Sequence, residues 1–251
     1  MDAAAFERAC TRAAALAKGA NGIGTLGEKS LHAALKFYFE PDESCHELPL
    51  GGFVADIIGE HGVIEIQTRN LRKLIRKLDA FLEACPVTVV HPLCCEKYVV
   101  WHEPCGNIAS RRKSPAHAKL WHALPELYAV KYALDNPRFR LCLCMLTIEE
   151  HRCLDGYGTQ KKTRATKLDR VPVKLHEEIW FESPSDYLRF LPQGLPVCFT
   201  SAEVADAGGM PVAYARILLN ILTYLELLLP AGRQGNQKIY RLREQTYYID
   251  D

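Results

Sequence analysis

Two acidic residues stand within neighbouring apolar segments of the sequence, Asp56 in GFVADIIG and Glu65 in GVIEIQTR. The GEHG motif between these segments is typical of a tight turn, so we predict that they form a β-hairpin. Whether the loop contains two or four residues, Ile58 faces Val63, and Asp56 then faces Glu65 because side chains alternate along a strand. Like charges directly opposite each other on paired strands are unfavourable. The sequence therefore predicts a carboxylate pair that requires compensation.

Two explanations of this carboxylate pair are open at the level of sequence. A divalent cation held by both acids would compensate their repulsion, since Mg²⁺ binds one or two carboxylates together with phosphate oxygens and water. Alternatively, the hairpin lies at an edge of the sheet and water solvates both acids. Gln67 follows Glu65 at the two-residue spacing and is predicted on the same side of the strand.

A predicted helix over residues 28–39 directs a third acid towards the same region. Glu28 shares a helical face with Leu31, His32 and Leu35, so its carboxylate is predicted to point towards the sheet that the helix covers. The alternative is that Glu28 lies in the first turn because the helix dipole favours an acid there. His32 alone is more often a packing residue than a ligand.

The elements that position these residues follow in a regular order. Short apolar segments separated by turn residues predict strands at 46–50, 52–59 and 62–68, and apolar spacing predicts a helix at 70–85 with Asn70 as its N-cap. Further strands are predicted at 87–93 and 97–103, followed by a helix near 120–134 and a strand at 139–148. From Glu28 to Trp101 the order is therefore helix, three strands, helix, two strands.

This order of elements, with its acids, resembles the PD-(D/E)xK nuclease superfamily over roughly the first half of the chain. The resemblance implies an α/β fold with a restriction-endonuclease-like mixed sheet flanked by helices. In that superfamily the aspartate and the glutamate bind Mg²⁺, and the third motif position is usually lysine. Asp56 and Glu65 would then be ligands of Mg²⁺ or Mn²⁺, Gln67 would occupy the lysine position, and Glu28 would be the supporting acid of the helix. Glutamine carries no charge, so stabilisation of developing charge would be weaker or rearranged.

Positive charge gathers at two places in the same part of the chain. A stripe opposite the leucine face of the 70–85 helix contains Arg72, Lys73, Arg76 and Lys77. The motif SRRKSP, predicted to be a loop, contains Arg111, Arg112 and Lys113. Such clusters bind phosphate backbones, and we expect both to contact DNA. For the helix, the alternative is a solvated face.

The C-terminal part has a different character. Residues 155–195 contain the motif KKTRATKLDR and several prolines, so we predict a linker with a short helix near SDYLRFL. Residues 196–251 resemble a winged helix, with a first helix at 199–208, a recognition helix at 211–229 and a wing at 232–240. The resemblance implies that Arg216 and Asn220 on the recognition helix, with Arg233 and Lys238 on the wing, contact DNA. Winged helices that bind proteins are the alternative. We therefore divide the chain into 1–154, 155–195 and 196–251.

Composition limits the classes of function that fit. The chain has 251 residues, 48% of them apolar, and a net charge of +1, so affinity for DNA has to come from local clusters. No apolar run is long enough to cross a bilayer, and ten cysteines within apolar segments predict reduced, buried thiols and a cytoplasmic location.

We expect a Mg²⁺- or Mn²⁺-dependent DNA endonuclease that hydrolyses phosphodiester bonds. Its expected partner is DNA rather than a membrane, and a second copy of the chain stays open as a further partner. The alternative is a non-catalytic DNA-binding regulator that retains a nuclease-like scaffold, and Gln67 is the residue that favours it.

Overall fold

The computed structural model describes residues 1–19, 30–156 and 165–243, and within them a seven-stranded sheet is the largest element. Its strands run in the order β1-β2-β3-β4-β6-β7, and β5 pairs with β4 outside this path. In chain order the bounds from β1 to β7 are His46–Leu50, Phe53–Gly59, Gly62–Ile66, Val87–His102, Ile108–Lys113, Phe139–Cys153 and Thr166–Phe181.

The sheet is mixed. β1, β2 and β3 form an antiparallel meander, β3 and β4 are parallel, β4 and β6 are parallel, and β6 and β7 are antiparallel. The predicted order of helix, three strands, helix and strand is confirmed. The two strands predicted at 87–93 and 97–103 form one strand, β4, whose register with β6 shifts between Cys94 and Glu96. A bulge of this kind lets one strand continue through a local irregularity.

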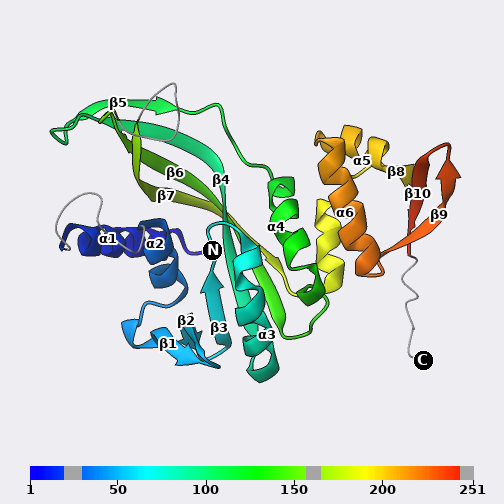
Figure 1. The fold of residues 1–251 in the computed structure, drawn as a ribbon, viewed down its shortest axis with the longest axis horizontal. Coiled ribbons are helices and arrows are strands. Elements are labelled where there is room, and N and C mark those ends of the chain that lie inside the picture. The colour runs from blue at the N-terminus through cyan, green and yellow to red at the C-terminus, as the bar shows by residue number, and fades with distance from the viewer. Residues whose placement is uncertain (20–29, 157–164, 244–251) are drawn as a thin grey trace.

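Helices cover both faces of the sheet (Figure 1). α1 (Ala3–Gly19) and α2 (Ser30–Phe39) pack on one face, and α3 (Ile75–Ala84) and α4 (Leu124–Ala129) on the other. Alternation along β6 serves both layers, because Leu141 and Leu143 join the core beneath α3 whereas Cys142 and Cys144 join the core beneath α2. Short 3-10 helices complete this part: η1 (Glu43–Cys45), η2 (Leu71–Leu74), η3 (Leu120–Ala123) and η4 (Lys131–Ala133).

The tight turn between β2 and β3 depends on Gly62. Its φ is +109°, and a Cβ added there would lie 2.2 Å from the carbonyl oxygen of Pro86. Only glycine combines this backbone conformation with so close an approach. Gly62 therefore holds the hairpin against the start of β4.

The start of the helical segment after β3 differs from the prediction. Asn70 adopts a left-handed conformation with φ of 57° and makes no side-chain cap. The carboxylate of Glu126 instead accepts hydrogen bonds from the backbone N–H groups of Asn70 at 3.1 Å and Leu71 at 2.7 Å. The cap thus comes from α4, a contact that local sequence does not indicate.

The C-terminal elements form a second, smaller sheet with two helices. They are η5 (Pro184–Phe190), β8 (Cys198–Thr200), α5 (Ser201–Gly208), α6 (Val212–Tyr224), β9 (Leu228–Gln234) and β10 (Gln237–Leu242). The strand order is β8-β10-β9. Two bounds differ from the prediction. Phe199 lies in β8 rather than in the first helix. α6 ends at Tyr224 rather than near residue 229, and β9 begins at Leu228.

The linker predicted at 155–195 is wrong for much of its length. Residues Thr166–Phe181 form β7, which pairs with β6 along nearly its whole length. Pro172 lies at a register shift between the two strands, and β7 is an edge strand of the sheet. Strands tolerate proline at both kinds of position. Pro172, one of the prolines that indicated an extended connection, therefore belongs to an edge strand.

One apolar core continues from the large sheet into the C-terminal elements. Leu124 and Leu127 of α4 belong to the same buried cluster as Leu218 and Leu222 of α6. Figure 1 shows α5, α6 and β8 to β10 at the end of the molecule opposite α1, with α4 between them and the sheet. Within the described residues, no helix is long and apolar enough to cross a membrane.

Candidate functional site

The β2–β3 hairpin brings Asp56 and Glu65 together. Ile58 pairs with Val63, the register that the turn predicted. The backbone N–H of Asp56 donates to Oε1 of Glu65 at 3.2 Å, and the backbone N–H of Ile66 donates to Oδ2 of Asp56 at 2.8 Å. Each carboxylate thus bonds to the backbone of the opposite strand, and the prediction that they are neighbours is confirmed.

This pair does not lie at an edge of the sheet. β2 runs between β1 and β3, and β3 runs between β2 and β4. The side chain of Glu65 is 1% exposed, whereas that of Asp56 is 20% exposed. The alternative in which water solvates both acids is therefore wrong for Glu65.

Two basic side chains contact the acids. Nζ of Lys77, on α3, donates to both carboxylate oxygens of Glu65, at 3.1 and 2.9 Å. Nε2 of His32, on α2, lies 3.2 Å from Oδ2 of Asp56. The two helices on opposite faces of the sheet thus each contribute a basic group beside the pair.

The two carboxyl groups differ in pKa. Burial acts to raise the pKa of Asp56, but the hydrogen bond and charge of His32, with the amide of Ile66 and the charge of Lys77, outweigh it and hold the pKa below its ordinary value. Burial and the charge of Asp56 raise the pKa of Glu65, although Lys77 opposes them. Asp56 is therefore the acid that ionises more readily.

Lys77 is the site residue that sequence reasoning missed. It was assigned to the solvent-facing stripe of its helix, together with Arg72, Lys73 and Arg76. Lys77 lies three residues after buried Leu74, however, at the border of the apolar face. Its side chain is 25% exposed and turns towards Glu65, as a long amphipathic side chain at such a border can do.

Gln67 does not join the two acids. Its side-chain amide donates to the carbonyl oxygens of Arg69 and Asn70, in the turn that follows β3. Its own carbonyl oxygen accepts a hydrogen bond from Nδ1 of His91 at 2.7 Å. The predicted lysine position is thus used to close a turn. Glu28 lies outside the described residues.

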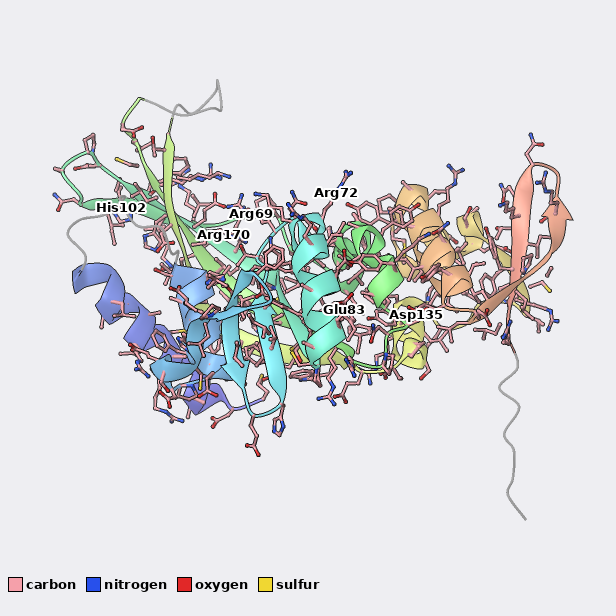
Figure 2. All side chains as sticks on the ribbon, turned by 60° about the horizontal axis from the view of Figure 1, so that its bottom comes forward. Arg69, Arg72, Glu83, His102, Asp135 and Arg170 are labelled. Carbon is pink, nitrogen blue, oxygen red and sulfur yellow. The ribbon has the colours of Figure 1, made fainter. Side chains whose placement is uncertain are left out.

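The other cations of the predicted helix stripe stay on the surface. Arg72, Lys73 and Arg76 are exposed, and none of them forms an ion pair with a described residue. Figure 2 shows Arg72 at the surface, near the start of the helical segment. These residues are accessible to a polyanion, and their contact with DNA stays a prediction; they do not line the acid pair.

The basic motif at 111–113 is a strand and not a loop. Arg111, Arg112 and Lys113 belong to β5, which pairs with β4. Arg111 forms an ion pair with Glu149 at 2.7 Å and its guanidinium lies 3.8 Å from the centre of the Tyr98 ring, while Lys113 pairs with Glu96. Cross-strand pairing explains the clustering, so only Arg112 is without an acidic partner among the described residues.

The predicted DNA-contacting residues of the C-terminal part meet in one groove. Arg216 and Asn220 on α6, with Arg233 and Lys238 on the β9–β10 hairpin, line a cavity of about 460 Å³. Lys238 is the cross-strand neighbour of Arg233. The three cations of this groove form no ion pair within residues 1–19, 30–156 and 165–243, so the groove is positively charged.

Asn220 is partly occupied by a contact with the rest of the molecule. Its Oδ1 accepts a hydrogen bond at 2.9 Å from Nζ of Lys131, which also lies 5.2 Å from the centre of the Tyr224 ring. Lys131 therefore adds a fourth cation beside the groove and fixes the orientation of the amide.

Metal-ligating residues do not gather at the acid pair or elsewhere in the part of the chain that the structure describes. No group of three or more His, Cys, Asp or Glu side chains there could hold an ion. All ten cysteines are free thiols; Cys142 and Cys144 are buried, as predicted, whereas Cys105 and Cys198 are exposed.

Comparisons with known proteins identify a family without an assigned activity. Residues 29–182 match the family described as "Domain of unknown function (DUF8091)". An uncharacterized protein of Treponema pallidum (strain Nichols) is 28% identical over 221 residues, which cover 87% of each chain. No solved structure matches. The match includes Asp56, Glu65 and Lys77, and the relative extends over most of the chain.

Proposed function

The chain belongs to the family described as "Domain of unknown function (DUF8091)", and we propose that it binds DNA and hydrolyses phosphodiester bonds with Mg²⁺ at Asp56 and Glu65. The family match spans the hairpin, α3 and the rest of the large sheet. The proposal therefore concerns the part of the chain that defines the family.

The observation that carries the proposal is the contact between Glu65 and Lys77 beside Asp56. In the PD-(D/E)xK nucleases that the sequence resembles, a lysine two residues after the glutamate completes the motif. Here that position is Gln67, yet an amine reaches the glutamate from α3 at 2.9 Å. Two carboxylates and one ammonium group are thus present together, although the third group comes from a different element.

The order of elements supports the same proposal. α2, the antiparallel meander β1-β2-β3, then α3 and the parallel strand β4 follow each other as in a restriction-endonuclease-like fold. In that fold, β2 with Asp56 and β3 with Glu65 would be the strands that carry the acids. We propose this fold for the large sheet and its helices.

The donor set fits a magnesium ion. Both candidate ligands are carboxylates, the hard oxygen donors that Mg²⁺ binds. Oδ1 of Asp56 accepts no hydrogen bond from the described residues, and this side chain is one-fifth exposed. Asp56 would hold the ion, and Glu65, whose carboxylate also accepts hydrogen bonds from Lys77, would be the second ligand. When bound, the ion supplies an acidified water and neutralises charge on the phosphate.

The protein's own groups have separate roles in this site. Lys77 favours the ionised form of Glu65 in its buried position, since an opposite charge in contact favours the charged form. His32 holds Oδ2 of Asp56 in place, and Oδ1 would be the oxygen that contacts the ion. The ammonium group of Lys77 also lies where it can stabilise negative charge that develops on a phosphate near the pair.

The groove of the C-terminal part supports DNA as the substrate. The sequence β8-α5-α6-β9-β10, with β10 between β8 and β9, follows the order of a winged helix. We propose that α6 enters the major groove, where Arg216 and Asn220 read base edges, and that Arg233 and Lys238 bind backbone phosphates.

A second candidate function is DNA binding without cleavage. Glu65 is almost completely buried beneath Lys77, so the acids are compensated in the protein itself. The side-chain amide of Gln67 donates to its own turn and, among the hydrogen bonds of the described residues, makes none to Asp56 or Glu65. These two observations favour a regulator that keeps the scaffold.

Nicking of plasmid and short oligonucleotides, with and without Mg²⁺ or Mn²⁺, separates the two functions. We expect the full chain to nick DNA only with the metal and Asp56→Asn to abolish nicking, while Asp135→Asn, which changes an exposed aspartate in the turn before β6, retains it. DNA binding without products in any metal would leave the regulator as the function. Equal nicking by Asp56→Asn would assign the activity to a contaminant.

A further inference from the structure

A second cationic site lies beside the start of β7. A pocket of about 210 Å³ is lined by Arg69, which follows β3, and by Lys167 and Arg170 of β7, together with Glu150 and Asp169. Figure 2 shows Arg69 and Arg170 close together, although about a hundred positions separate them in the sequence. Neither arginine was predicted to bind anything.

The two acids of this pocket are already satisfied. The carboxylate of Asp169 accepts hydrogen bonds from the hydroxyl and the backbone N–H of Ser30, at the start of α2. Glu150 pairs with Arg152 and lies 3.8 Å from Nζ of Lys97. The three cations of the pocket, in contrast, form no ion pair with any described residue. The pocket therefore carries an excess of positive charge.

Arg170 is the strongest single indication of a ligand. Its Nε is buried and has no hydrogen-bond partner among the described residues. Buried donors in folded proteins are almost always paired, so this N–H requires an acceptor. Burial lowers the pKa of the neighbouring His91 and the charge of Arg170 also lowers it, although the carbonyl oxygen of Gln67 and the charge of Glu126 oppose them. The acceptor that fits such a guanidinium is an anion with several oxygens.

The pocket is joined to the acid pair through two elements. On α2, Ser30 contacts Asp169 of the pocket and His32 contacts Asp56. On the other side, Arg69 follows Glu65 by four residues, which span at most about 13 Å of extended chain. A DNA strand covers such a distance in a few nucleotides, since its phosphates advance by about 3.4 Å along the helix axis.

We propose that Arg69, Lys167 and Arg170 bind one backbone phosphate of a DNA strand and hold that strand beside Asp56 and Glu65. The choice of DNA rests on the proposed function. The volume suits a phosphate group, because pockets for larger organic ligands are about 300–1,000 Å³. The site differs from the α6 groove in position and in role, since it orients the strand at the acids and reads no bases.

Binding of short DNA to the full chain in EDTA tests this site without any cleavage. The variants are Arg69→Ala and Lys167→Ala, and the matched control is Lys174→Ala, an exposed lysine further along β7. All three side chains are exposed and without ion pairs among the described residues, so the fold should be retained. The probes are an oligonucleotide with a 5′-phosphate and the same oligonucleotide without it, measured at several salt concentrations.

We expect Arg69→Ala and Lys167→Ala to weaken binding of both probes by about tenfold at low salt. The slope of log affinity against log salt should fall by about 0.7–0.9 for the lost contact. Lys174→Ala should bind like the wild type. Equal losses in the control, no loss in either variant, or a loss only for the 5′-phosphorylated probe would each overturn the proposal. If the variants bind DNA as expected in EDTA but the wild type never cuts DNA, the proposed nuclease activity is refuted and the proposed phosphate site is not.

Discussion

At the scale of residues, the contact between Lys77 and Glu65 determines what the acid pair can do. A buried carboxylate beside a second one is costly, and the ammonium group of Lys77 offsets part of that cost. Removing one partner leaves the other charge buried. The effect of such a change should depend on pH, because Glu65 can avoid the cost by binding a proton.

Lys77→Met is therefore expected to lower the free energy of unfolding by about 2–4 kcal/mol at about pH 8. The pKa of Glu65 in the folded state is already raised, and the substitution raises it further, so the loss is present above this pKa and fades as the pH falls below it. Denaturant unfolding at about pH 8 and about pH 5 measures the difference. Lys73→Met, an exposed neighbour, should change stability by less than about 0.5 kcal/mol at either pH.

The double variant Lys77→Met with Glu65→Gln should recover much of the stability, because it removes the buried charge together with its partner. An equal loss for Lys77→Met at both pH values would contradict a charge effect. In that case the methylene groups of Lys77 would matter through packing alone.

At the scale of elements, two hairpins define the two proposed sites. The β2–β3 hairpin aligns the acids, and the β9–β10 hairpin closes the groove against α6. The first register follows from turn length and alternation, which are local properties of the chain. The second places Arg233 and Lys238 opposite each other and beside Arg216.

The groove predicts different effects for its two walls. Arg233→Ala should weaken binding to all duplexes alike and reduce the salt slope by about 0.9, since a phosphate contact releases counterions without reading bases. Arg216→Ala should weaken the free energy of binding by about 1–3 kcal/mol for duplexes with a preferred sequence, and should change binding to other duplexes little. Binding to a mixed pool of duplexes measures both, with Arg8→Ala on α1 as the control at the opposite end of the molecule. If both groove variants bind the pool like the wild type, a protein partner becomes the better assignment for the groove.

Local patterns were sufficient for some elements and not for others. The turn GEHG and the two-residue alternation predict the Asp56–Glu65 register, because both act over a few residues. The charge partners of β5 lie on other strands, so the SRRKSP motif was mistaken for a loop. Lys77 of α3 contacts Glu65 on β3, and Glu126 of α4 caps the helical segment that follows β3. Both contacts join elements that are distant in the sequence or in different layers of the fold. Contacts between distant segments leave no periodic signal in the sequence.

At the scale of the whole molecule, the C-terminal elements belong to one core with the large sheet. Leu218 and Leu222 of α6 share a buried cluster with Leu124 of α4, and Trp121 lies edge-on to Tyr214 with ring centres 4.9 Å apart. A cut near residue 196 would expose this apolar surface. Point substitutions in the groove are therefore better tests of DNA recognition than deletion of the C-terminal part.

We expect the chain to unfold in a single transition that includes both parts. Leu222→Ala should lower the free energy of unfolding by about 2–5 kcal/mol. Because the two parts share one core, denaturant unfolding followed by circular dichroism and by tryptophan fluorescence should show the same new midpoint. Val197→Ala, at a position that is 86% exposed, is the control and should have little effect. Two separate transitions, with only one shifted, would show that the parts unfold independently.

The central claim is that Asp56 and Glu65 hold a divalent cation, and the melting temperature in the presence of Mg²⁺ tests it most directly. A ligand that binds only the folded state at about 100 times its Kd adds about 2.7 kcal/mol, which for a chain of this size corresponds to a rise of about 5–10 °C. We predict this rise for the wild type and for Asp135→Asn, and none for Asp56→Asn. An equal rise in Asp56→Asn, or no rise in the wild type, would contradict the claim.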